Sequence, residues 1–201
     1  MKKKLLVLAT AIFMVGGSAN AQAVEQGNMI IDAYYGFPNL YTNVFKTAYA
    51  NSGTEIDLKI GGIGPVGGRF EYMVADKIGV GLDVGFNNSN ITYFEDQGAN
   101  RYEYDFSTQK LGFMATFNYH FLQNVDMVDA YVMFGAGYGN RTFTFASTDP
   151  NYVESSVESL IPVASRIGVG MRYFFTDNIG LNLGLGFGQG GLVNAGISAK
   201  F

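Results

Sequence analysis

The chain contains no cysteine and no tryptophan, and it has only one histidine and four prolines among 201 residues. The absence of cysteine excludes disulfide bonds, thiolate metal sites and a cysteine nucleophile. Only 15% of the residues are charged and 48% are hydrophobic, a composition too apolar for a disordered chain. No run of 18 or more apolar residues occurs, which excludes a membrane-spanning helix. The hydrophobic residues must therefore follow a shorter period.

The first 21 residues have the three parts of a secretory signal peptide. Lys2, Lys3 and Lys4 form a basic start, residues 5–15 are apolar, and Ala19-Asn20-Ala21 is a small-residue cleavage motif. We expect cleavage after Ala21 and a single mature domain over residues 22–201. The alternative, a short membrane anchor, fits less well because the apolar run is too short. Cleavage removes three lysines and no acid, so the net charge changes from −4 to −7, which disfavours nucleic-acid binding.

Alternation with a period of two residues dominates the rest of the chain. Over residues 179–188, Ile and Leu alternate with Gly and Asn, and residues 78–87 repeat the pattern. Such alternation predicts strands with two unlike faces, and so many glycines would each cost a helix ~1 kcal/mol. The pattern predicts eight strands, over residues 29–37, 66–74, 78–87, 110–121, 132–139, 161–175, 179–188 and 193–201.

The predicted connections alternate between short and long. Residues 75–77 and 176–178 are tight turns, and residues 122–129 form a moderate one. Long links are expected over residues 38–62, 87–101 and 147–158, and the last link, 188–191, is short. An internal repeat matches residues 72–86 to residues 173–187 at an offset of 101, and in its frame Glu71 corresponds to Arg172.

The two faces of these strands decide between a soluble barrel and a membrane barrel. One face consists almost entirely of large apolar residues, and the other is rich in glycine with scattered charges. A soluble, lipocalin-like barrel would present many lysines and glutamates on its polar face. Small residues on that face instead suit the narrow lumen of an eight-stranded barrel, and aromatic residues near the strand ends suit interfacial girdles. We therefore predict an all-β, eight-stranded antiparallel up-and-down transmembrane β-barrel, closed because lipid offers no partner to a strand edge.

Three segments resemble the small eight-stranded outer-membrane barrels of Gram-negative bacteria, of the OmpX/Ail type and the OmpA transmembrane domain. They are Phe-Gly-Ala-Gly-Tyr-Gly (134–139), Asp-Asn-Ile-Gly-Leu (177–181) and the terminal Gly-Ile-Ser-Ala-Lys-Phe (196–201). The resemblance implies a location in the cell outer membrane, contact with lipid and lipopolysaccharide, and a monomer. It also implies that Phe201 belongs to the signal read by the barrel-assembly machinery. Ala199 departs from the family pattern, in which a larger residue is common.

Charged residues on the inward face are the candidate site. Unpaired charges in a narrow lumen are costly, whereas paired ones can form a network that fills it. We therefore expect a plugged, salt-bridged lumen, and the alternative is an OmpW-like narrow channel for small or hydrophobic solutes, with Tyr34, Tyr104, Phe106 and Phe143 at its mouth. The predicted network comprises Asp32, Arg69, Glu71, Asp83, Lys110, Arg166, Arg172 and Lys200.

No pattern in the sequence indicates an enzyme, a cofactor or a metal site. His120, the only histidine, lies at the short-turn end of its strand, so we interpret it as a polar lumen or rim residue rather than part of a catalytic triad. The three long links are acidic, which suits a structural or surface-interaction role such as cation-bridged lipopolysaccharide contact or adhesion. In the first link, Tyr41, Phe45 and Tyr49 have helical spacing, although an extended segment fits equally well. The acidic residues are Glu55, Asp57, Glu95, Asp96, Glu103, Asp149, Glu154 and Glu158.

Overall fold

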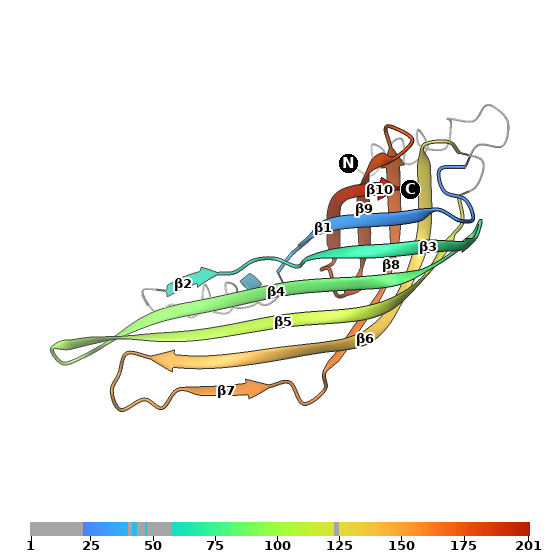
Figure 1. Cartoon of the computed structure of the whole chain (residues 1–201). Coiled ribbons are helices and arrows are strands. Elements are labelled where there is room, and N and C mark those ends of the chain that lie inside the picture. Colours follow the sequence, from blue (N-terminus) through green and yellow to red (C-terminus); the bar gives the residue numbers. More distant parts are fainter. Residues whose placement is uncertain (1–21, 40–41, 44–46, 48–57, 123–124) are drawn as a thin grey trace.

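The computed structural model describes residues 22–39, 42–43, 47, 58–122 and 125–201 (Figure 1). The predicted signal peptide, the tyrosines and phenylalanine of the first link (Tyr41, Phe45 and Tyr49), and the acids Glu55 and Asp57 lie outside these residues. In the described part of the chain, no helix has the length and apolar character needed to cross a membrane.

Eight antiparallel strands form a closed barrel, as the sequence predicts. Neighbours along the sheet path pair in the order β3, β1, β10, β9, β8, β6, β5, and β4 closes the ring by pairing with both β5 and β3. The first and last barrel strands pair over eight positions, from Ile30–Lys200 to Phe37–Val193, so neither keeps a free edge. The barrel strands are β1 (Met29–Phe37), β3 (Val66–Ala75), β4 (Ile78–Gln97), β5 (Asn100–His120), β6 (Val128–Ser147), β8 (Val163–Phe174), β9 (Ile179–Gly188) and β10 (Val193–Lys200).

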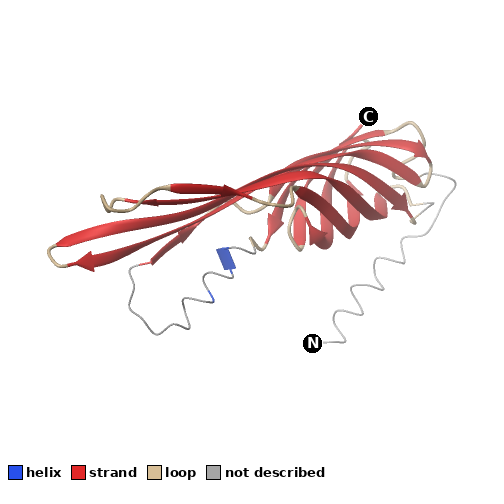
Figure 2. Ribbon diagram, turned by 90° about the horizontal axis from the view of Figure 1, so that it is seen from below, coloured by secondary structure: helices blue, strands red, loops and turns tan. Residues whose placement is uncertain are grey.

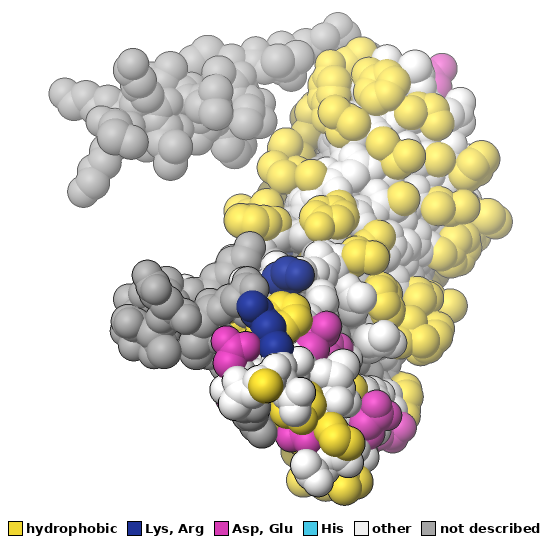
Figure 3. Space-filling view, turned by 90° about the vertical axis from the view of Figure 1, so that its left-hand side faces the viewer, with side chains coloured by type: hydrophobic (Ala, Val, Ile, Leu, Met, Phe, Trp, Pro, Cys, Tyr) yellow, Lys and Arg dark blue, Asp and Glu magenta, His cyan; other side chains and the backbone are white. Residues whose placement is uncertain are grey.

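The predicted alternation between an apolar outward face and a polar inward face is confirmed. Along β9, Leu181 is 54% exposed and the next residue, Asn182, is 3% exposed. Hydrophobic side chains cover the visible outer wall of the barrel in Figure 3, where a soluble protein would carry charges. An apolar outer wall around a polar interior is the arrangement that hydrocarbon requires of a spanning barrel.

One of the predicted long links is wrong, because strands continue through it. β4 and β5 extend beyond the barrel as one hairpin that turns only at Gly98 and Ala99, so residues 87–101 are mostly strand (Figures 1 and 2). Cross-strand aromatic pairs stabilise this extension. Tyr93 lies directly opposite Tyr104, and their rings stack with centroids 5.1 Å apart.

Two short strands widen this projecting sheet. β2 (Leu58–Gly61), within the predicted first link, pairs with β4, and β7 (Ser155–Glu158), within the predicted third link, pairs with β6. The chain thus has ten strands in its described part, eight of them in the barrel. We refer to β2, β7 and the projecting parts of β4, β5 and β6 as the extension.

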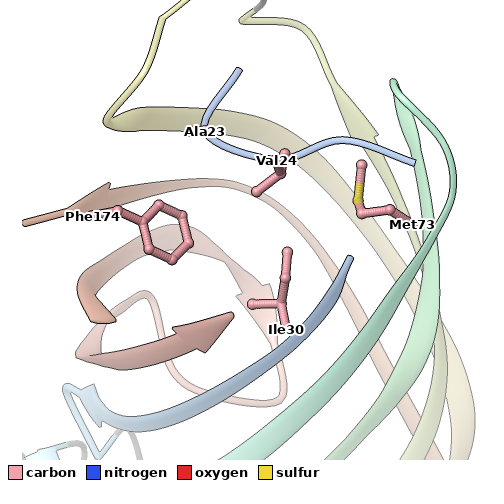
Figure 4. Close-up of a cluster of buried hydrophobic side chains, with 5 residues drawn as sticks. All are labelled: Ala23, Val24, Ile30, Met73 and Phe174. Atoms are coloured by element: carbon pink, nitrogen blue, oxygen red, sulfur yellow. The ribbon is translucent and has the colours of Figure 1, made fainter. Parts of the chain in front are cut away.

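A cluster of buried apolar side chains closes the short-turn end of the barrel (Figure 4). The segment before β1 folds across this end, where the Ala23 N–H donates to the carbonyl of Val125 at 2.9 Å. Lys200 Nζ donates to the Ala23 carbonyl at 2.7 Å and lies 5.0 Å from the centre of the Phe174 ring. The cluster consists of Ala23, Val24, Ile30, Met73 and Phe174.

Candidate functional site

Five of the eight predicted lumen charges meet in one connected network. Asp32, Arg69, Glu71, Asp83 and Arg172 project inward from β1, β3, β4 and β8, and each is at most 5% exposed. Register places three of them in a row, because Asp32 pairs with Arg69 and Arg69 pairs with Asp83 on adjacent strands. Alternation along each strand therefore produces the network: the residues at these positions can only point into the lumen.

Arg172 is the centre of the lower, short-turn half of the network. Its Nε and Nη2 donate to both oxygens of Asp32 at 3.1 and 2.8 Å, and Nη2 also donates to Glu71 at 2.7 Å. Nη1 donates to Asp129 at 2.9 Å, and the guanidinium lies 4.4 Å from the centre of the Tyr131 ring. One buried cation thus binds three carboxylates through charge-assisted bonds, which are the stronger class of hydrogen bond.

His120 contacts two of the same carboxylates through its two ring nitrogens. Its Nδ1 lies 2.6 Å from Asp129 and its Nε2 lies 2.9 Å from Glu71, and all three residues are buried. Ionised carboxylates only accept hydrogen bonds, so both contacts are satisfied when both ring nitrogens carry protons. Asn118 completes the coordination of Glu71 by donating from Nδ2 at 2.6 Å.

Arg69 is the centre of the upper half of the network. It donates to Asp83 at 3.1 Å and to Asn194 at 3.0 Å, and its Nη1 lies 3.7 Å from Asp32, which links the two halves. Tyr34 donates to Asp83 at 2.8 Å, and its ring lies 4.5 Å from the Arg69 guanidinium. Tyr34, which the sequence suggested as a mouth residue of a channel, is therefore a buried member of the network.

The short turn between β9 and β10 folds into the lumen above Arg69. Gln189 donates from Nε2 to Asp83 at 2.7 Å. Gly85 and Gly112 leave room for the Gln189 side chain, because a Cβ at either position would lie within 3.0 Å of it. Arg166 holds the turn from below by donating to the backbone carbonyls of Gln189 and Gly191.

Three predicted network members lie apart from the ion pairs. Arg166 binds the carbonyls of the turn, Lys200 binds the carbonyl of Ala23 at the opposite end, and Lys110 lies at the loop-side mouth. The sequence pattern predicts one network of all inward charges, whereas the barrel places these three cations at other heights along its axis. Within the described part of the chain, no group of His, Asp and Glu side chains is arranged to hold a metal ion.

Sequence reasoning missed three residues that complete the network. Asp129 falls in a predicted connection, yet it lies in β6 directly opposite Arg172, and extending the alternation of the predicted strand by three residues reaches it. Tyr131 lies on the same inward face and accepts a hydrogen bond from Arg69 at 3.2 Å. Gln189 had no periodic signal, because it lies in a turn.

The network, the turn and the apolar cluster fill successive levels of the barrel interior. Buried charges are tolerated when they are paired and hydrogen-bonded, as they are around Arg69 and Arg172. The arrangement can hold the wall strands in register. It offers no exposed nucleophile or base among the paired residues, since these are buried and engaged with each other.

The chain matches one known protein family and is similar to several solved structures. The profile of the family described as "Outer membrane protein beta-barrel domain" matches residues 8–191. Among solved structures, the N-terminal β-barrel domain of Pseudomonas aeruginosa OprF is similar at 16% identity with a TM-score of 0.48, and covers 89% of this chain and 100% of that one. OprG from Pseudomonas aeruginosa is similar at 14% identity with a TM-score of 0.46, covering 90% of this chain and 99% of that one.

A third similar structure is Ail, the attachment invasion locus protein of Yersinia pestis, in complex with the heparin analogue sucrose octasulfate. It shows 13% identity and a TM-score of 0.40, and covers 88% of this chain and 99% of that one. No curated protein matches the chain. The family match spans most of the chain, and the closed barrel has the apolar outer wall that lipid requires; this protein therefore belongs to the outer membrane protein beta-barrel domain family and resides in the outer membrane.

Proposed function

We propose that this protein is a non-conducting outer-membrane barrel with a plugged, salt-bridged lumen, and that it acts in a structural or surface-interaction role through its acidic extension. The observation that carries the proposal is the set of ion pairs centred on Arg172. Its guanidinium binds carboxylates from β1, β3 and β6 and so connects the wall across the lumen.

The β9–β10 turn supports the same proposal from the loop side. Gln189 reaches Asp83 in the middle of the lumen, and Arg166 fixes the turn from below. Ions would have to pass this turn, both halves of the network and the apolar cluster around Ala23. A narrow channel for small solutes needs a continuous lumen, and these three obstacles count against it.

The extension is the part of the protein suited to contact with other molecules. Figure 3 shows Asp and Glu side chains on it, beside a group of Lys and Arg side chains, and its described acids include Glu95, Asp96 and Glu103. Tyr104 donates to Asp149 at 3.2 Å, and desolvation together with this bond raises the pKa of Tyr104. An ordered, acidic sheet beyond the membrane suits divalent-cation bridges to lipopolysaccharide or adhesion to a surface.

Planar-bilayer recording of the purified mature protein tests the sealed lumen. We expect no steady current. A matched test uses Gln189→Gly, which removes the side chain that reaches Asp83, and we expect brief openings at most because the Arg172 ion pairs remain. Large, stable single-channel steps from the unaltered protein would overturn the proposal and favour the channel.

Trimming the extension tests the surface role. Replacing residues 89–108 with a two-residue turn leaves Asn87 and Lys110 paired at the mouth and removes most of the β4–β5 projection. We expect the trimmed protein to keep its barrel and to lose calcium-dependent binding to lipopolysaccharide. Equal binding by the full and trimmed proteins would exclude the β4–β5 projection as the interacting part.

A further inference from the structure

The connection between β7 and β8 carries two adjacent apolar side chains that the rest of the described chain leaves uncovered. Leu160 is 97% exposed, the largest value for any large hydrophobic residue in the described part of the chain, and Ile161 is 73% exposed. Removing a leucine or isoleucine side chain from water is favourable. Both side chains would therefore gain from contact with another apolar surface.

The strand register shows that this pair lies in a bulge. Tyr138 of β6 pairs with Val163 of β8. Thr142 of β6 pairs with Glu158 of β7. The three β6 residues between these two pairs therefore face four residues of the other segment, 159–162. Such an extra residue is a β-bulge, which redirects the neighbouring side chains, whereas strict alternation would send adjacent residues to opposite faces.

Hydrogen bonds hold the bulge against β6 at both of its ends. The Ser159 N–H donates to the carbonyl of Arg141 at 2.7 Å, and the Gly139 N–H donates to the carbonyl of Pro162 at 3.0 Å. Within the bulge, the Ser159 hydroxyl donates to the carbonyl of Ile161 at 3.2 Å. The chain thus passes from β7 into β8 alongside β6 (Figure 1), and the exposed pair is part of the sheet rather than of a loop that stands away from it.

The bulge lies at the loop-side edge of the lipid-facing wall. The last outward side chains of the wall below it are Tyr138 and Val163, which are 56% and 54% exposed, and Phe187 at the end of β9 is 71% exposed. A strand rises ~3.3 Å per residue, so Ile161, two residues before Val163, lies ~7 Å above this row. The exposed pair therefore continues the apolar surface of the wall upward.

Polar residues limit how far this apolar surface extends. Asn140 and Thr142 follow Tyr138 on the outward face of β6, and Glu158 is the outward residue directly before the bulge. Pro162 within the bulge has no N–H, which removes one backbone donor that hydrocarbon could not satisfy. The surface thus suits the boundary between acyl chains and headgroups rather than the middle of the bilayer.

We propose that Leu160 and Ile161 insert into the outer leaflet of the membrane, among the acyl chains next to the headgroups. Lipid is the occupant because the pair is continuous with a wall that lipid already covers. Apolar side chains at this boundary are buried ~5–10 Å into it. The lipid-facing surface is then taller on the β6–β8 side of the barrel, and the base of β7 is fixed to the membrane surface. This inference holds whether or not the barrel conducts and whatever the extension binds.

The fluorescence of a single introduced tryptophan tests the insertion, because the chain has none of its own. The Leu160→Trp protein is placed in phosphatidylcholine vesicles whose acyl chains carry bromine near the headgroups, which quenches indole emission on contact. We expect several-fold quenching by the brominated lipid and little quenching by acrylamide in the water. Leu183→Trp, in the middle of β9, is the lipid-exposed control, and Val153→Trp, at a residue 83% exposed just before β7, is the water-exposed control.

Two results would overturn the proposal. Quenching of Leu160→Trp by acrylamide, equal to that of Val153→Trp, would place the bulge in water. Emission shielded from both quenchers would show that protein rather than lipid covers the bulge. Ile161→Trp, measured in the same way, replaces Leu160→Trp if that variant fails to fold.

A charge placed beside the reporter tests whether the apolar character of the bulge drives the insertion. In the Leu160→Trp protein, Ile161→Asp should move the bulge into the water and transfer quenching from brominated lipid to acrylamide, because a carboxylate is costly in hydrocarbon. Val157→Asp adds the same charge on β7, at a residue that is 55% exposed, and should leave the quenching unchanged. Equal quenching by brominated lipid with and without Ile161→Asp would remove Ile161 from the inserted surface.

Discussion

Glu71 accepts a hydrogen bond from Arg172 at 2.7 Å, although the two residues lie 101 positions apart. The same offset relates the two copies of the internal repeat, residues 72–86 and 173–187, and extends it by one residue on the inward face. Their strands, β3 and β8, are four places apart around the eight-stranded ring, so they face each other across the lumen. Half of the barrel thus contributes an acid where the other half contributes a base.

Substitution of Arg172 by methionine should strongly destabilise the barrel. It leaves the carboxylates of Asp32, Glu71 and Asp129 buried without their shared cation. Breaking a buried ion pair from one side costs about 3–5 kcal/mol. The loss is measured as the change in free energy of unfolding by urea in lipid vesicles.

The matched control for that experiment is Lys77→Met at the exposed β3–β4 turn. Removing a surface charge of this kind changes stability by ~1 kcal/mol or less. A similar small effect for Arg172→Met would show that water enters the lumen and solvates the three carboxylates.

Gly170→Ala should also destabilise the protein, through packing alone. A Cβ at this position would lie 2.3 Å from Cζ of Tyr131, which must then move away from Arg69 and Arg172. Overpacking of this kind costs about 1–3 kcal/mol. Thermal unfolding followed by circular dichroism measures it.

Gly135→Ala is the control for this substitution, because it also lies on the inward face. Its Cβ would meet nothing closer than 3.4 Å, which is ordinary contact. We expect its midpoint of unfolding to match the unaltered protein. Equal losses in both variants would point to backbone effects of glycine rather than to Tyr131.

The mature protein should begin at Gln22. Intact-mass measurement of the protein extracted from outer membranes checks this prediction. Replacing Ala19 and Ala21 with leucine removes the small residues that the cleavage motif requires. The doubly substituted chain should accumulate uncleaved, and normal processing of it would place the cleavage site elsewhere.

Phe201 should affect assembly of the barrel in the cell more than the stability of the folded barrel. Its side chain is 68% exposed on the barrel exterior, and its backbone already pairs with Met29 through two bonds of 2.8 and 2.9 Å. Deleting Phe201 should lower the amount of folded protein in the outer membrane several-fold. Refolding of the purified chain into detergent should be unaffected.

Phe175→Ala provides the comparison, because Phe175 is an exposed aromatic residue at the same end of the barrel. If both changes lower the amount in the membrane equally, the loss reflects aromatic contact with the lipid interface, and Phe201 has no special part in assembly.

The strand pattern could be predicted from the sequence because period two is a local property. Each inward position from Asp32 to Ser198 follows from counting along a strand. The barrel, its closure and the face that meets lipid all follow from that count and from the distribution of charge and glycine.

Three features could not be predicted: the length of the strands beyond the membrane, the contacts made by a turn, and the height of inward charges along the barrel axis. The sequence pattern predicts links where the extension lies, because the strands of the extension lose the apolar outward face once they leave the membrane. Aromatic pairs such as Tyr93–Tyr104 nevertheless keep these strands together. Gln189 enters the lumen from a turn, where no periodicity applies. The separation of Lys110, Arg166 and Lys200 from the network depends on their height along the axis, which the inward pattern does not record.

The apolar cluster around Ala23 at one end and the Gln189 turn at the other isolate the ion pairs from bulk solution. Dissolved salt weakens attraction between charges that water surrounds, with a screening length of ~8 Å at physiological ionic strength, but it acts little on enclosed pairs. The barrel should therefore keep its resistance to unfolding from dilute buffer to concentrated brine, whereas contacts made by the acidic extension fade over the same range.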